Sequence, residues 1–156
     1  MKIKLYALFP GICLLGIFFA LAKQAHGTLG ESADSVESDR NALSAVRHAA
    51  SVRKGYTVQE VGSGSSVVRE YVSQSGIVFG IAWNGLVHPD LMQLLGSYSG
   101  EYYEALKQTP RKPGRRRLEV KTDQVVVEKW GHMRNLQGRA YAPALIPAGV
   151  RVDEIR

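Results

Sequence analysis

The segment from Ile77 to Asn84 constrains the fold more than any other part of the sequence. Its large residues are Ile77, Phe79, Ile81 and Trp83, and the small residues between them are Val78, Gly80, Ala82 and Asn84. A period of two is typical of a β-strand, and an uncharged run favours a strand that is buried on both faces. We therefore expect a central strand whose large face fills a core and whose small face lets another element approach closely.

Two further strands precede this segment. Alternating side chains predict a strand over 56–61, and 67–72 is predicted as a second strand. The Gly- and Ser-rich stretches 62–65 and 74–76 predict the turns. Turns this short require the neighbouring strands to pair in antiparallel fashion.

A helix is predicted after the central strand. Apolar residues recur with helical spacing from Leu91 to Ala105, and Asp90 with Gln93 fits a capping box at the start of the helix. Glycines within this stretch, Gly96 among them, predict a kink or a break.

The remaining segments complete an α+β fold. The stretches 118–122 and 125–130 predict two strands, or one hairpin broken at Asp123, and 139–145 predicts a last strand before an irregular tail. The expected architecture is an antiparallel sheet of about five strands with helices packed on one face. The expected order of elements is α-β-β-β-α-β-β.

The first helix of this order is predicted from a short series of apolar residues at helical spacing. This series predicts one helix near 35–50 within an N-terminal helical segment, 28–55. The α+β core domain is then expected to span 56–156.

Residues 1–27 have the pattern of a secretory signal peptide. Lysines near the N-terminus precede a charge-free apolar run from Leu5 to Ala22, and Ala25 and Gly27 provide the small residues of a cleavage site. We expect cleavage after Gly27. Cleavage after Ala22 is the alternative position, and an uncleaved N-terminal anchor is the alternative role. The sequence thus predicts export by the secretory route to the periplasm or the extracellular space.

Loss of the leader changes the charge and the thiol content of the working protein. The chain has 20 Lys and Arg against 14 Asp and Glu, a net charge of +6. Three lysines lie within residues 1–27, so the net charge falls from +6 to +3. Cys13 is the single cysteine and leaves with the leader, which excludes a disulfide framework in the mature protein.

Known catalytic and cofactor motifs are missing from the sequence. The run 62–66 lacks the Gly-Lys-Ser/Thr of a phosphate-binding loop, and 96–100 has a tyrosine where a nucleophile elbow needs its nucleophile. A zinc site would have to draw His48, His88 and His132 from distant segments. The sequence therefore predicts no metal and no cofactor.

Glu70 and His132 are the candidate acid–base residues. Glu70 would be a candidate acid if it were buried within its strand, and His132 lies at a strand end beside Trp130. Structural roles are the alternatives, because Glu70 can meet a cross-strand partner and His132 can bond to the backbone. His88 precedes Pro89 and is expected in a loop or at a helix cap.

Two groups of residues could bind a ligand without catalysing a reaction. The aromatic candidates for a groove are Trp83, Tyr98, Tyr102 and Trp130, although aromatics at such spacings also fill cores. The cationic candidates are Arg111, Lys112, Arg115, Arg116 and Arg117, which either contact an anionic partner or form a solvated loop. For an exported protein we expect an anionic envelope polymer or another envelope protein as partner, and no nucleic acid.

Several motifs together resemble a known family. They are Val68-Arg69-Glu70-Tyr71-Val72, Gly76 to Trp83, Pro89-Asp90-Leu91 with Leu94-Leu95-Gly96, Gly131-His132-Met133-Arg134 with Gly138 to Tyr141, and Pro147-x-Gly149-Val150. This combination resembles the small exported bacterial proteins of the domain of unknown function 2844 family. The resemblance implies export in proteobacteria and a single domain, and it brings no activity, cofactor or catalytic residue. One departure is Asn84-Gly85-Leu86, where the family pattern has a Gly-Pro pair.

The function expected from the sequence is a non-enzymatic binding or envelope-associated role. The signal segment and the lack of a catalytic constellation support it. Two alternatives stay open, namely a small periplasmic hydrolase that uses Glu70 and His132, and a polyanion-binding protein that uses the loop from Arg111 to Arg117.

Overall fold

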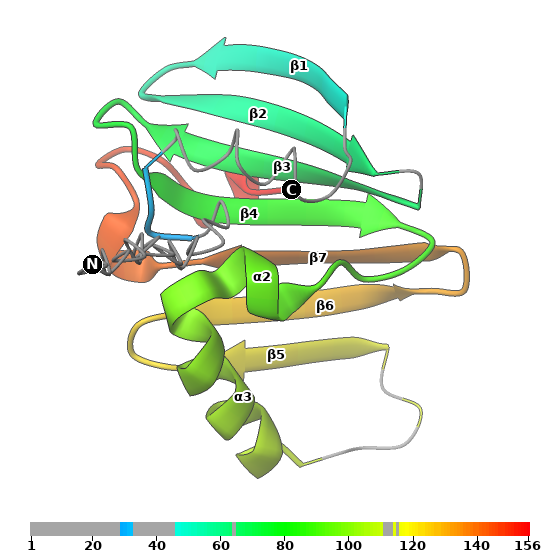
Figure 1. The fold of residues 1–156 in the computed structure, drawn as a ribbon. Coiled ribbons are helices and arrows are strands. Elements are labelled where there is room, and N and C mark those ends of the chain that lie inside the picture. The colour runs from blue at the N-terminus through cyan, green and yellow to red at the C-terminus, as the bar shows by residue number, and fades with distance from the viewer. Residues whose placement is uncertain (1–28, 33–45, 64, 111–113, 115) are drawn as a thin grey trace, which may run out of the picture.

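The computed structural model describes residues 29–32, 46–63, 65–110, 114 and 116–156. Seven strands form one antiparallel sheet in the order β1-β2-β3-β4-β7-β6-β5 (Figure 1). They are β1 (Val46–Arg53), β2 (Tyr56–Ser63), β3 (Ser66–Ser73), β4 (Val78–Gly85), β5 (Arg117–Lys121), β6 (Val126–His132) and β7 (Asn135–Tyr141). The predicted α+β class and antiparallel pairing are confirmed, but the sheet has seven strands rather than about five.

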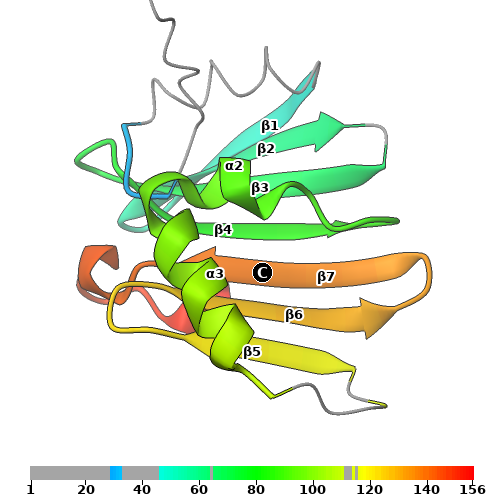
Figure 2. The same ribbon diagram turned by 60° about the horizontal axis from the view of Figure 1, so that its bottom comes forward.

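The helical segment between β4 and β5 covers one face of the sheet. It consists of α2 (Leu91–Leu95), a 3-10 turn (Gly96–Tyr98) and α3 (Ser99–Gln108), and Figure 2 shows it crossing the sheet from β4 toward β5. Asp90 is the N-cap and its carboxylate accepts a hydrogen bond from the Met92 amide. The predicted helix is therefore confirmed, with its break at Gly96.

The C-terminal segment covers the other face of the sheet. It continues from β7 through two 3-10 turns, Pro143–Leu145 and Val152–Glu154. Ile155 is fully buried there among Tyr56, Tyr71, Phe79 and Ala82. The sheet is thus the middle layer between a helical layer and an irregular C-terminal layer.

Strand β4 is buried on both faces, as predicted, but a β-bulge changes which residues share a face. Tyr71 pairs with Gly80 and Val72 pairs with Val78, so Phe79 is an extra residue in β4. Ile81 and Trp83 belong to the core under the helices, whereas Phe79 belongs to the cluster around Ile155. The prediction that all four large side chains share one face is therefore wrong at Phe79.

Two predicted element boundaries also need correction. Residues 46–50 of the predicted helix near 35–50 belong to strand β1 instead, and 33–45 lie outside the described residues. The last strand is β7, Asn135–Tyr141, rather than 139–145, because Pro143 already begins a 3-10 turn.

The predicted leader, residues 1–27, lies outside the part of the chain that the structure describes. Among the described residues, no helix has the length and the apolar character that crossing a membrane requires.

Candidate functional site

Four connections meet at the end of the sheet where β4 and β6 finish (Figure 1). Ser66 pairs with Gly85, Gly85 with Leu136, and Leu136 with Gly131. This row places the β2–β3 turn, the β4–α2 loop and the β6–β7 turn side by side. The loop that leads into β5 reaches the same end, since the first residue of β5, Arg117, pairs with Trp130.

A pocket of about 460 Å³ opens at this end. Its lining residues are His88, Arg116, Leu118, Lys129, Trp130, Gly131, His132 and Leu136. None of these eight residues is acidic, and two of them carry a permanent positive charge at neutral pH. We call this pocket the cationic pocket.

A glycine on β7 makes room for Trp83, which contacts the pocket residue His88. Trp83, Gly138 and Lys129 lie in one row across β4, β7 and β6. A Cβ atom on Gly138 would collide with the Trp83 ring and with the Glu128 carbonyl. Glycine at this position therefore lets the indole lie across β7 in the core, where Trp83 is only 2% exposed.

Trp83 in turn fixes the state of His88. The indole Nε1–H donates a hydrogen bond to His88 Nδ1 at 2.9 Å. Because an indole N–H can only donate, Nδ1 must be the unprotonated nitrogen, and the proton of the neutral ring is on Nε2. Burial lowers the pKa of His88, and the charge of Lys129 lowers it further. His88 thus lines the pocket as a neutral hydrogen-bond donor.

Lys129 brings a charge onto the helix-covered side of the sheet. Its row neighbours include Trp83, and its ammonium lies 5.8 Å from the centre of the Tyr102 ring. An aromatic face stabilises a cation at this distance. In the part of the chain that the structure describes, no carboxylate forms an ion pair with Lys129 or Arg116.

The two acid–base candidates lie in different places. Glu70 is 2% exposed and lies in the middle of β3, where it pairs with Ile81. His132 is exposed at the end of β6, and its Nδ1 lies 3.3 Å from the Met133 carbonyl oxygen. Three strand spacings and five residues along a strand separate the two, a distance of roughly 20 Å. The structure therefore does not bring Glu70 and His132 together.

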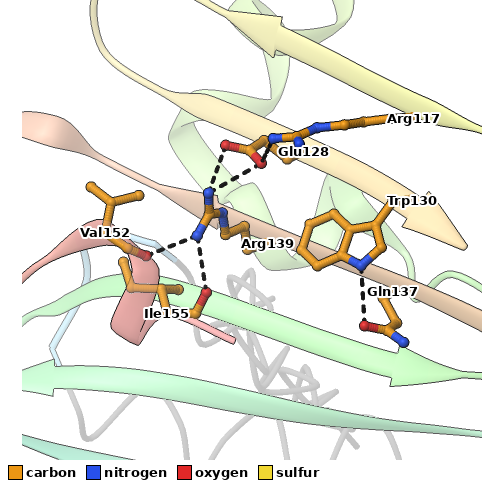
Figure 3. Close-up of polar contacts among 7 residues, drawn as sticks. All are labelled: Arg117, Glu128, Trp130, Gln137, Arg139, Val152 and Ile155. Atoms are coloured by element: carbon orange, nitrogen blue, oxygen red, sulfur yellow. Dashed lines mark hydrogen bonds and ion pairs between the residues drawn. The ribbon is translucent and has the colours of Figure 1, made fainter.

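The aromatic candidates also separate. Trp83 and Tyr102 are buried in the core, and Tyr98 packs against that core. Trp130 is half-buried and its indole N–H donates to Gln137 Oε1 at 3.1 Å (Figure 3). This arrangement favours the core interpretation for the first three and leaves Trp130 as the accessible aromatic.

Of the basic stretch, Arg111, Lys112 and Arg115 lie outside the described residues. Arg116 lines the cationic pocket. Arg117 instead forms an ion pair of 2.7 Å with Glu128. The two described arginines of this stretch therefore lie in different places, Arg116 in the cationic pocket and Arg117 beside the carboxylate of Glu128.

A second pocket, of about 410 Å³, lies on the face that carries the C-terminal segment. Figure 3 shows its central network. Arg139 donates to Glu128 at 3.0 Å and to the carbonyl oxygens of Val152 and Ile155 at 2.9 and 3.5 Å. Glu128 is buried, and Arg117 and Arg139 neutralise it. Arg139 therefore connects the carboxylate of Glu128 on the sheet with the C-terminal segment.

A third pocket, of about 380 Å³, lies on the other side of the same segment. Arg69 pairs there with Glu60 at 2.9 Å. The Tyr71 hydroxyl accepts from the Arg156 amide at 2.9 Å and donates to the Arg156 carbonyl oxygen at 2.7 Å. Burial raises the pKa of Tyr71. The Tyr71 contacts attach the C-terminal residue to β3, and the ion pair connects β3 with β2.

Sequence reasoning missed Lys129, Glu128 and Arg139. One signal was available, because Lys129 repeats the alternation of Val125 and Val127, which are buried. A lysine at the next position of an apolar alternation indicates a charge on the core side of a strand. No comparable sequence signal indicates Glu128 and Arg139, which are direct cross-strand neighbours on β6 and β7.

No group of three or more His, Cys, Asp or Glu side chains that could hold a metal occurs among the described residues. One family model, described as "Protein of unknown function (DUF2844)", matches residues 25–155. No curated protein and no solved structure matches the chain.

Proposed function

The chain belongs to the DUF2844 family of proteins of unknown function, and from that premise we propose that it is a non-enzymatic binding domain. Its ligand is an anionic group that enters the cationic pocket. The location is the cell envelope, a part of the proposal that rests on the leader pattern and that mass spectrometry of the mature N-terminus tests.

One observation carries the proposal. Both pockets beside the C-terminal segment contain carboxylates among their lining residues, and these carboxylates pair with neighbouring cations, as Glu60 does with Arg69 and Glu128 with Arg139. Arg116 and Lys129 line a pocket without any acidic residue. A concave site with unpaired cations attracts an anion and favours charge-assisted hydrogen bonds to it.

The donor groups suit an oxyanion such as a phosphate, a sulfate or a carboxylate. The Arg116 guanidinium offers a planar fork, the Lys129 ammonium offers a point charge, and His88 offers one neutral N–H. Trp83 fixes the tautomer of His88 before any ligand arrives. Such preorganisation lowers the entropic cost of binding.

The catalytic alternative receives no support from this geometry. Glu70 and His132 lie roughly 20 Å apart by strand spacing, and Glu70 is not among the lining residues of the cationic pocket. The hydrolase therefore stays a prediction of the sequence.

Binding of dextran sulfate, measured by isothermal titration calorimetry against uncharged dextran, tests the proposal. The assay uses the chain from Thr28, which is the mature form that the leader pattern predicts. Replacing both cations, Arg116→Gln with Lys129→Gln, should weaken the affinity for dextran sulfate by about tenfold or more, a loss of about 1.4 kcal/mol or more.

The matched control is Lys54→Gln with Lys121→Gln. Both lysines are exposed at the opposite end of the sheet, so this variant has the same net charge as the test variant. Equal losses in the two variants would mean that net charge alone attracts the polyanion, and the proposed site would be wrong. Circular dichroism confirms that both variants are folded.

A further inference from the structure

The end of the sheet that holds the cationic pocket also exposes large aliphatic side chains. Leu86 is 56% exposed and Val87 is 50% exposed in the β4–α2 loop, and Met133 is 90% exposed in the β6–β7 turn. Single exposed apolar residues are ordinary, but three in two neighbouring connections need a reason.

The strand register brings these two connections together. Gly85 pairs with Leu136, and Leu86 and Met133 lie just beyond this pair in their respective connections. Both views show the end of β4 beside the β6–β7 turn (Figures 1 and 2). The apolar side chains therefore project from the same end of the molecule, which we call the apolar tip (Leu86, Val87 and Met133).

Three cations, Arg134, Arg116 and Lys129, and the neutral donor His88 lie close to the apolar tip. Arg134 adjoins Met133 in a left-handed backbone conformation (φ 66°), and His88 directly follows Val87. Arg116 and Lys129 lie in the pocket beside them. In the described residues no ion pair joins Arg134 to a carboxylate.

Aliphatic side chains on two neighbouring connections, beside cations that form no ion pair within the described residues, fit the surface of an anionic lipid bilayer. Aliphatic groups gain free energy at the boundary between headgroups and acyl chains, and Lys and Arg gain it near anionic headgroups. We infer that this end of the protein docks peripherally on an anionic bilayer, with the apolar tip inserted and a lipid headgroup phosphate in the cationic pocket. The inference rests on the proposed function and names the source of its anion.

Co-sedimentation with large unilamellar vesicles tests the inference. The chain from Thr28 should sediment with vesicles of phosphatidylglycerol and phosphatidylcholine in equal parts, and not with phosphatidylcholine alone. The tip variant Leu86→Ser/Val87→Ser/Met133→Ser should partition onto the anionic vesicles about tenfold or more weakly, while its affinity for dextran sulfate stays unchanged.

The matched control is Val52→Ser, because Val52 is 84% exposed near the opposite end of the sheet. It should sediment like the unmodified chain. Thermal unfolding of each variant shows that a loss of sedimentation does not come from a loss of folding.

The outcomes separate the two proposals. Vesicle binding that survives in the tip variant would overturn membrane insertion and leave simple anion capture. Binding of dextran sulfate without any sedimentation on anionic vesicles would assign the pocket to a soluble polymer instead of a bilayer. Failure to bind either probe would remove the proposed function and the inference together.

Discussion

The contact between Trp83 and His88 shows how one partly buried hydrogen bond sets the protonation state of a side chain that lines the pocket. The indole N–H occupies His88 Nδ1, so a second proton on the imidazole would displace this bond. Burial and the Lys129 charge disfavour the imidazolium in the same direction. The folded protein therefore keeps His88 neutral at a pH where a free histidine is already partly charged.

This difference makes stability depend on pH. Because the pKa of His88 is lower in the folded state, the unfolded chain binds more protons below the ordinary histidine value of about 6.5. The contribution of His88 to the free energy of unfolding is present above that value and is lost as the pH falls toward the folded-state pKa.

We expect His88→Gln to reduce this pH dependence. Urea unfolding at pH 7.5 and pH 5.5, for the unmodified chain and the variant, measures it. The variant should lose less stability between the two pH values than the unmodified chain. An equal loss in both would mean that other groups govern the acid response.

At the level of strands and helices, the space around a glycine decides whether a larger residue can replace it. Gly138 has the Trp83 ring above it, whereas Gly100 in α3 has open space where its Cβ would be. The two positions therefore predict opposite effects for the same substitution.

Gly138→Ala should destabilise the protein by about 3 kcal/mol, because the added methyl group displaces the indole or the backbone of β6. Gly100→Ala should stabilise it by about 0.5 kcal/mol, since alanine favours the helix. Urea unfolding followed by tryptophan fluorescence compares the two. A Gly138→Ala variant as stable as the unmodified chain would show that Trp83 can move away without cost.

The sequence predicted the strands whose apolar side chains are buried in the structure. The stretches 67–72 and 125–130 are rich in valine and aromatic residues, and both correspond to strands. Strand β1 was missed because an edge strand forms through backbone bonds to β2 and can leave a side chain such as Val52 exposed, so it shows no alternation. The only sequence feature that could indicate the β-bulge at Phe79 is the glycine that follows it, Gly80.

The start of β7 was missed for a related reason. Gly138 and its polar neighbours resemble a turn, although Gly138 lies in the strand to make room for a distant tryptophan. Of the residues that line the cationic pocket, Arg116, Trp130 and the two histidines could be named from the sequence. The place of Lys129 within its row on the sheet, beside Gly138 and Trp83, follows only from the strand register.

Across the domain as a whole, the C-terminal segment makes the sheet a three-layer structure. Arg139 is the main connection, since it bridges Glu128 on β6 and two carbonyl groups of the segment. Removing one partner of a buried ion pair leaves a charge with too few neutralising groups.

Arg139→Met should therefore lower the free energy of unfolding by about 3 kcal/mol. Arg151→Met is the matched control, because Arg151 pairs with Asp153 on the surface, with 77% of its side chain exposed. That variant should change stability by less than about 0.5 kcal/mol. Similar losses in both, measured by guanidinium unfolding, would contradict the central role of Arg139.

The strands run between two rims of different character. The rim with the apolar tip carries Arg116, Lys129 and Arg134, which form no ion pair within the described part of the chain, and the opposite rim carries the β1–β2 and β3–β4 turns. A strand of eight residues reaches about 25 Å. A molecule that stands on its apolar tip would therefore act as a spacer that holds the far turns about that distance above the lipid. Its helical layer and its C-terminal layer would both stay accessible to other molecules.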